Sequence, residues 1–155
     1  MQKSKYGLIG CGAMFLSMCA PADAVDASLR TTSANQPDAI WSKIKGFCDI
    51  TNALPTLKCA LSADGQTRTL TTPDGKNVVE KLEAHDDAGR TYSYTILESG
   101  PLPVANYHSK IAIVPDGAGS AIVWTGKFDA KGASDEEAKK VIEGIYKAGS
   151  DELAK

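Results

Sequence analysis

The sequence has 155 residues, the size of one compact domain. Its 43% hydrophobic and 23% charged residues are typical of a globular protein and exclude disordered and collagen-like chains. A formal net charge of −2 argues against a nucleic-acid partner, because phosphate contacts need a basic face. Beyond residue 24, no segment approaches the roughly 18 apolar residues that a membrane span needs.

The first 24 residues have the pattern of a secretory signal peptide. Two lysines precede a mostly apolar run, and Ala22-Asp23-Ala24 has the A-x-A form of a cleavage site. We therefore expect residues 1–24 to be removed and residues 25–155 to form one exported, periplasmic domain. The alternatives are a buried N-terminal helix and a lipoprotein in which Cys19 carries the lipid.

Only two of the four cysteines, Cys48 and Cys59, lie beyond the predicted signal peptide. In an oxidising compartment an even number of cysteines favours a disulfide, so we predict a Cys48–Cys59 bond. A metal pair or a redox pair is the alternative, but the spacing is not C-x-x-C and no nearby histidine completes a zinc shell. We place His85 and His108 at the surface, and we expect no metal and no cofactor.

The hydrophobic period of the mature chain changes from helical to strand-like and back again. After a first extended segment, apolar residues between Pro37 and Gly46 predict one or two short helices. Turn signals rich in Gly, Pro and Asp then separate runs of strand-forming residues, which predicts antiparallel hairpins. The expected strands are Val25–Ser33, Leu57–Leu61, Arg68–Thr72, Asn77–His85, Thr91–Leu97, Ala105–Val114 and Ser120–Ala130.

A long helix is predicted for the last 21 residues. Ser134-Asp135-Glu136-Glu137 is a capping box, and an apolar stripe follows it at helical spacing. Gly144 and Gly149 lie inside this helix, where each glycine costs about 1 kcal/mol relative to alanine. We expect both glycines to allow the close approach of another element.

Alternation within the strands places aromatic and aliphatic side chains on the face that meets this helix. The large aromatics are interleaved with small residues such as Ser109 and Gly126. This mixture predicts a cavity between the sheet and the helix, although a packed core is compatible with the same residues.

Together these features resemble the polyketide cyclase/dehydrase (SRPBCC) branch of the START-like, Bet v 1-like helix-grip superfamily, and in particular its small exported bacterial members. The resemblance covers residues 25–155 and implies an α+β fold. In this fold a curved, seven-stranded antiparallel sheet wraps around a long C-terminal helix, with one or two short helices after the first strand. The resemblance rests on the order of the elements and on Trp41, Glu80-Lys81-Leu82, Thr91-Tyr92-Ser93-Tyr94, Pro101–Tyr107 and Val123-Trp124.

Members of this superfamily hold lipids, hormones, sterols or polyketides in the cavity, and some of them are enzymes, so the fold does not settle the function. We expect an exported protein that binds a small hydrophobic or amphipathic ligand, such as a lipid, a polyketide or an aromatic metabolite. Its oligomeric state is not indicated. The residues expected to line the site are Phe47, Tyr92, Tyr94, Tyr107, Ile111, Trp124, Phe128, Ile142 and Tyr146, with Arg68 and Glu80 as polar anchors.

The resemblance also implies that loops close over the cavity mouth, and Pro101–Ala105 lies at such a position. If this segment is a gate, Leu102 and Val104 contact the ligand. The alternative is a stiff turn, in which the prolines fix φ and Leu102 packs inward.

Glu80 is the candidate catalytic residue. It shares the alternation phase of Val78 and Leu82, which points its carboxylate into the apolar face, and Arg68 is the cation expected to meet it. The simpler interpretation is a structural ion pair or a ligand-orienting polar spot. The alternatives are a cyclase or dehydratase that uses Glu80 as acid or base, and a structural envelope protein with a filled interior.

Overall fold

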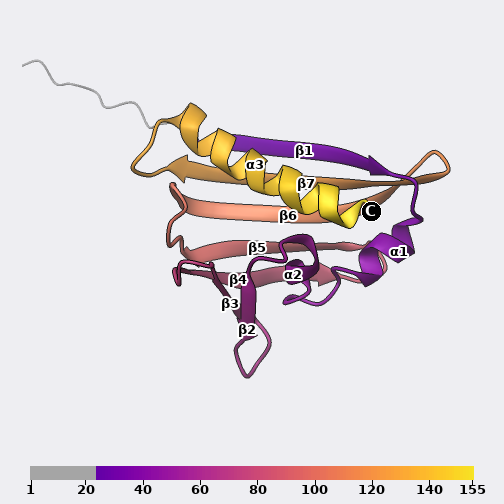
Figure 1. Cartoon of the computed structure of the whole chain (residues 1–155), viewed down its shortest axis with the longest axis horizontal. Helices are drawn as coiled ribbons and strands as arrows, with labels where there is room; N and C mark the ends of the chain where they lie inside the picture. Colours follow the sequence, from indigo (N-terminus) through magenta and orange to yellow (C-terminus); the bar gives the residue numbers. More distant parts are fainter. Residues whose placement is uncertain (1–23) are drawn as a thin grey trace, which may run out of the picture.

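One antiparallel sheet and three helices make up residues 24–155, the part of the chain that this computed structural model describes (Figure 1). The predicted signal peptide and the Cys19 alternative fall outside these residues, apart from Ala24. The helices are α1 (Pro37–Ser42), α2 (Ile50–Ala53) and α3 (Asp135–Leu153). The strands are β1 (Val25–Ser33), β2 (Lys58–Leu61), β3 (Thr67–Thr71), β4 (Asn77–Asp86), β5 (Thr91–Glu98), β6 (Val104–Asp116) and β7 (Gly119–Ala130).

The sheet has the strand order β1-β7-β6-β5-β4-β3-β2, so that β2 to β7 follow one another as hairpins and β1 pairs with the last strand. This confirms the predicted fold class and all seven strands. The largest difference lies in β6, which continues to Asp116. Asp116 pairs with Gly119 and leaves only Gly117 and Ala118 in the turn, where Gly117 adopts the left-handed conformation (φ 57°) that such tight turns favour.

Helix α3 lies across the sheet face formed by β1 and β7 (Figure 1). Its capping box is present, because Ser134 Oγ accepts from the backbone N–H of Glu137 and the Glu137 carboxylate accepts from the backbone N–H of Ser134. The close approach expected at Gly149 is confirmed, since a Cβ there would lie 2.8 Å from the Trp124 ring. The same expectation was wrong for Gly144, which has nothing within 4 Å of the corresponding position.

The Cys48–Cys59 disulfide is present, with a Cα–Cα distance of 5.6 Å. It ties the turn before α2 to β2, at one edge of the sheet, and thereby holds α2 over the sheet. No helix in residues 24–155 is long and apolar enough to span a membrane.

Candidate functional site

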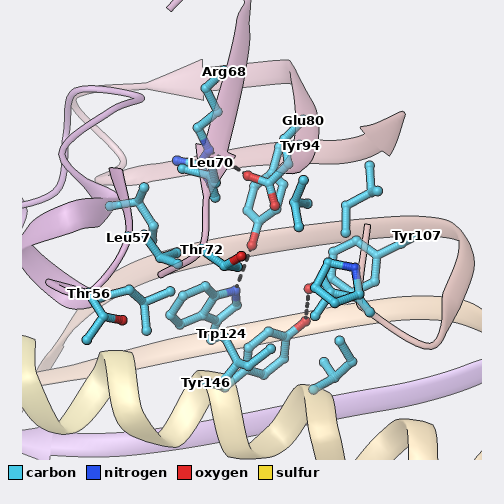
Figure 2. A pocket seen from close by; sticks show the side chains of 18 residues that line it. Thr56, Leu57, Arg68, Leu70, Thr72, Glu80, Tyr94, Tyr107, Trp124 and Tyr146 are labelled. Atoms are coloured by element: carbon cyan, nitrogen blue, oxygen red, sulfur yellow. Dashed lines mark hydrogen bonds and ion pairs between the residues drawn. The ribbon is translucent and has the colours of Figure 1, made fainter. Parts of the chain in front are cut away.

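A cavity of about 230 Å³ lies between the sheet and α3. Side chains from the sheet form one wall, α2 and the segment after it form another, and α3 closes the third side (Figure 2). Most of the lining is aliphatic or aromatic. The lining residues are Ile50, Leu54, Thr56, Leu57, Arg68, Leu70, Thr72, Val78, Glu80, Tyr94, Ile96, Pro101, Leu102, Tyr107, Trp124, Ile142, Ile145 and Tyr146.

The structure brings together only part of the residues that we expected to bind a ligand. Five of them lie outside the lining, where they pack against other side chains of the core. Phe47 and Tyr92 pack edge to face, with ring centroids 6.0 Å apart, and Phe128 stacks on Tyr107. Val104 and Ile111 are fully buried within β6. The expected residues that do line the cavity are Arg68, Glu80, Tyr94, Leu102, Tyr107, Trp124, Ile142 and Tyr146.

Arg68 and Glu80 form a buried ion pair in the cavity wall. They face each other across β3 and β4, and Arg68 Nε donates to Glu80 Oε2 at 2.5 Å. Arg68 Nη1 also donates to the backbone carbonyl of Phe47, and the guanidinium lies 4.1 Å from the Phe47 ring centroid. The wall therefore carries a cation and a carboxylate in direct contact, with side chains only 1% and 7% exposed.

The surroundings of this pair act on both of its charges. Burial raises the pKa of Glu80, and the adjacent Arg68 guanidinium opposes that rise without cancelling it. Burial disfavours the charged form of Arg68, but the Glu80 carboxylate, together with Tyr92 and Tyr94, outweighs this effect and keeps the pKa of Arg68 above its usual value. Arg68 thus stays a cation, and Glu80 is the group of the pair that can take up a proton.

Trp124 anchors the opposite side of the cavity through hydrogen bonds. Its indole Nε1 donates to Ser109 Oγ at 3.1 Å and to the Tyr94 hydroxyl at 3.2 Å. Ser109 Oγ in turn donates to the carbonyl of Thr125 at 2.7 Å. Burial raises the pKa of Tyr94 well above its usual value, so this phenol is neutral at physiological pH.

Tyr107 and Tyr146 complete this side of the cavity, with their hydroxyls 2.6 Å apart (Figure 2). The Tyr146 ring stacks on Trp124, with centroids 4.8 Å apart. Tyr146 reaches the sheet because Gly126 has no side chain: a Cβ there would lie 2.1 Å from the Tyr146 hydroxyl oxygen. The aromatic side chains are therefore fixed in place by contacts on both sides.

The mouth of the cavity lies between the segment after α2 and the turn between β5 and β6. Thr56 and Pro101 are the exposed residues of the lining, and Leu102 beside Pro101 is half-buried. Val104 is buried and does not line the cavity. A gate at Pro101–Ala105 therefore remains a prediction. Leu102 is placed to contact a ligand as part of such a gate, whereas Val104 is not.

Both histidines are at the surface, as expected. His85 Nε2 lies 2.9 Å from the carbonyl of Lys45, and His108 Nδ1 lies 2.8 Å from the Glu83 carboxylate. Within residues 24–155, no group of three or more His, Cys, Asp or Glu side chains is arranged to hold a metal ion.

Comparison with known proteins places this geometry in context. A family model described as polyketide cyclase / dehydrase and lipid transport matches residues 24–155. The solved structure of the protein XoxI from Bacillus cereus is 32% identical, with a TM-score of 0.79 over 84% of this chain and 93% of that chain. An uncharacterised protein from Bacillus thuringiensis is also 32% identical, with a TM-score of 0.79 over 83% of this chain and 96% of its own.

A more distant likeness extends to plant enzymes. Norcoclaurine synthase from Thalictrum flavum, solved in complex with dopamine and hydroxybenzaldehyde, is 22% identical, with a TM-score of 0.61 over 98% of this chain and 95% of that chain. At this identity the likeness shows the fold alone. A search of curated protein sequences gave no significant match. The family match and the shared fold confirm the resemblance found in the sequence.

Proposed function

Because this chain belongs to the polyketide cyclase / dehydrase and lipid transport family, we propose that it binds a small, mostly apolar molecule in the cavity between its sheet and α3. The observation that carries the proposal is the cavity itself, about 230 Å³ of space beside buried aromatic side chains. An engineered apolar cavity of about 150 Å³ in another protein holds benzene. The space here therefore suits a molecule of about two fused rings.

The stability that closer packing would add here supports the same proposal. At about 24 cal/mol per Å³, filling a space of about 230 Å³ with apolar side chains would add at most about 5.5 kcal/mol. That is comparable with the whole stability of a typical domain. Larger side chains at Leu70 or Ile142 would fill the space, so a chain with a purely structural role gains nothing from leaving it open.

The proposed site of action is the periplasm, after removal of the signal peptide. The Cys48–Cys59 disulfide supports this location, because such bonds persist in oxidising compartments. Mass spectrometry of the protein from a periplasmic extract tests it. A mature chain that begins near Val25 supports the proposal, and a lipidated Cys19 or an uncleaved N-terminus contradicts it.

Binding is tested by expressing the chain with its own leader, purifying it gently and recording a native mass spectrum before organic extraction. We expect a stoichiometric hydrophobic adduct. Ile142→Trp, which fills the cavity from α3, should abolish the adduct. Val141→Trp, at the exposed neighbouring position of the same helix, should retain it. A wild-type protein with no adduct and no shift in Tm with lipids or aromatic compounds would refute the proposal.

Acid–base catalysis by Glu80 is a second candidate function. It is favoured by one observation: Glu80 lines the cavity, and burial raises its pKa toward the range that suits proton transfer. Incubating the extracted ligand with the protein and following its mass tests this function. Conversion that Glu80→Gln abolishes while the adduct persists would support catalysis, and an unchanged ligand would leave the protein a binder.

A further inference from the structure

One phenolic proton in the cavity wall is used by no protein group. Indole nitrogen only donates, so the contact between Trp124 Nε1 and Tyr94 uses the Tyr94 oxygen as acceptor. The Tyr94 hydroxyl proton is not used in this contact, and no acceptor among residues 24–155 receives it. Tyr94 lines the cavity, so this proton is available to a bound molecule.

The same wall offers one unused acceptor. Arg68 Nε donates to Oε2 of Glu80, whereas no donor within the described residues reaches Oε1. Glu80 also lines the cavity. A carboxylate oxygen of a buried side chain gains from a hydrogen-bond donor in the ligand, since water is largely excluded there.

Tyr94 and Glu80 are neighbouring residues on the sheet. In the β4–β5 register Leu82 pairs with Tyr94 and Glu80 pairs with Ile96, which places Tyr94 diagonally opposite Glu80 on one face of the sheet. Burial raises the pKa of Tyr94, and the negative charge of Glu80 adds to the rise. Figure 2 shows both side chains on the same wall of the cavity.

Three other hydroxyl groups around the cavity are engaged in a chain of hydrogen bonds. The hydroxyls of Tyr107 and Tyr146 bond to each other, and Ser109 donates to a backbone carbonyl. Arg68 is almost inaccessible, and two of its three guanidinium nitrogens, Nε and Nη1, already donate to protein oxygens. We therefore take the free phenolic proton of Tyr94 and the free carboxylate oxygen of Glu80 as the groups that recognise a polar part of the ligand.

We propose that the ligand of this cavity carries an uncharged hydroxyl group, an alcohol or a phenol, on an apolar ring system. One hydroxyl accepts a hydrogen bond from Tyr94 and donates one to Glu80 Oε1. A carboxylate donates nothing to Glu80 and meets it with like charge, and an ammonium group leaves the Tyr94 proton without an acceptor. This inference rests on the proposed function and names the ligand class for it.

Four probes built on the same ring system distinguish the contribution of the hydroxyl group to binding from that of the rings: 2-naphthol, 2-methoxynaphthalene, naphthalene and 2-naphthoate. We expect isothermal titration calorimetry at pH 7 to show 2-naphthol binding at least about tenfold more tightly than its methyl ether, because a hydrogen bond to a buried charged group is lost in the ether. Naphthalene should resemble the ether, and 2-naphthoate should bind most weakly.

A matched pair of tyrosines tests the residue assignment. Tyr94→Phe should reduce the preference for 2-naphthol over naphthalene about fivefold, the worth of one neutral hydrogen bond, and leave the affinity for naphthalene unchanged. Tyr92→Phe is the control. Tyr92 lies two residues away on the same strand, and its hydroxyl is buried without a partner but does not line the cavity. It should change neither affinity. Both variants keep the aromatic ring and leave Arg68 and Glu80 in place, so the measured affinities do not depend on disrupting the ion pair.

The outcomes separate this inference from the proposed function. Equal affinity for 2-naphthol, its ether and naphthalene would overturn the hydroxyl inference while leaving a ligand-binding cavity. Tightest binding of 2-naphthoate would overturn it in favour of an anionic ligand. Absence of binding by all four probes would overturn the proposed function, and the inference with it.

Discussion

The buried Arg68–Glu80 pair gives the sharpest prediction about stability. Its side chains are 1% and 7% exposed and meet at 2.5 Å, so removing either partner leaves the other as an unpaired group in an apolar wall. Arg68→Met and Glu80→Gln should each lower the free energy of unfolding by about 3–5 kcal/mol at pH 7. The double variant Arg68→Met/Glu80→Leu should recover most of this loss, because two apolar side chains need no partner.

The pH dependence distinguishes the two single variants. Without Arg68, nothing opposes the burial that raises the pKa of Glu80. A carboxyl group with a raised folded pKa adds stability below its unfolded pKa, and this is lost as pH rises through the folded pKa. The deficit of Arg68→Met should therefore shrink toward pH 4 and grow toward pH 8. The deficit of Glu80→Gln should persist across this range, because arginine does not deprotonate.

Urea unfolding followed by tryptophan fluorescence measures both effects, provided that the m-value is unchanged. The double variant serves as the control for side-chain volume. Losses below about 1 kcal/mol for both single variants at pH 7 would show that water reaches the pair, since exposed ion pairs are worth no more than that. The description of a desolvated cavity wall would then be refuted.

Two further predictions concern the elements around the cavity. Gly144→Ala should stabilise the protein by up to about 1 kcal/mol in thermal or urea unfolding, because α3 gains helix propensity and nothing lies within 4 Å. Gly149→Ala should destabilise it despite the same propensity gain, because the new Cβ would lie 2.8 Å from the fixed Trp124 ring; equal effects of the two variants would contradict the packing of α3. Reducing the Cys48–Cys59 disulfide should cost about 3 kcal/mol, as expected for so short a loop, and should weaken probe binding as well, because this loop supplies one cavity wall. Unchanged affinity for 2-naphthol after reduction would show that this wall does not need the bond.

The sheet could be predicted from the sequence because its strands alternate cleanly and each is bounded by turn residues. The same alternation placed Glu80, Tyr94 and Trp124 on the inner face, and all three line the cavity. The two-residue period of a strand fixes which face of the sheet a side chain occupies. It says nothing about how far along the strand the helix covers that face. This is why Ile111 and Phe128 were expected in the site and are instead buried outside its lining.

The wall that the sequence did not reveal comes from the segment between the two cysteines. Ile50, Leu54 and Leu57 line the cavity, but α2 spans only Ile50–Ala53, which is too short to show a helical period. The predicted disulfide was the feature of the sequence that could have indicated this wall. A bond between Cys48 and Cys59 requires that the residues between them lie against the sheet edge to which β2 belongs.

A crystal structure of the protein soaked with 2-naphthol would show directly whether the cavity holds a ligand. We expect density for the two rings between the sheet and α3, against Leu70 and Ile142, with the hydroxyl within hydrogen-bond distance of Tyr94 and Glu80 Oε1. A structure in which side chains fill this space, or in which the naphthol lies only on the outer surface, would contradict the claim that the cavity is a ligand site.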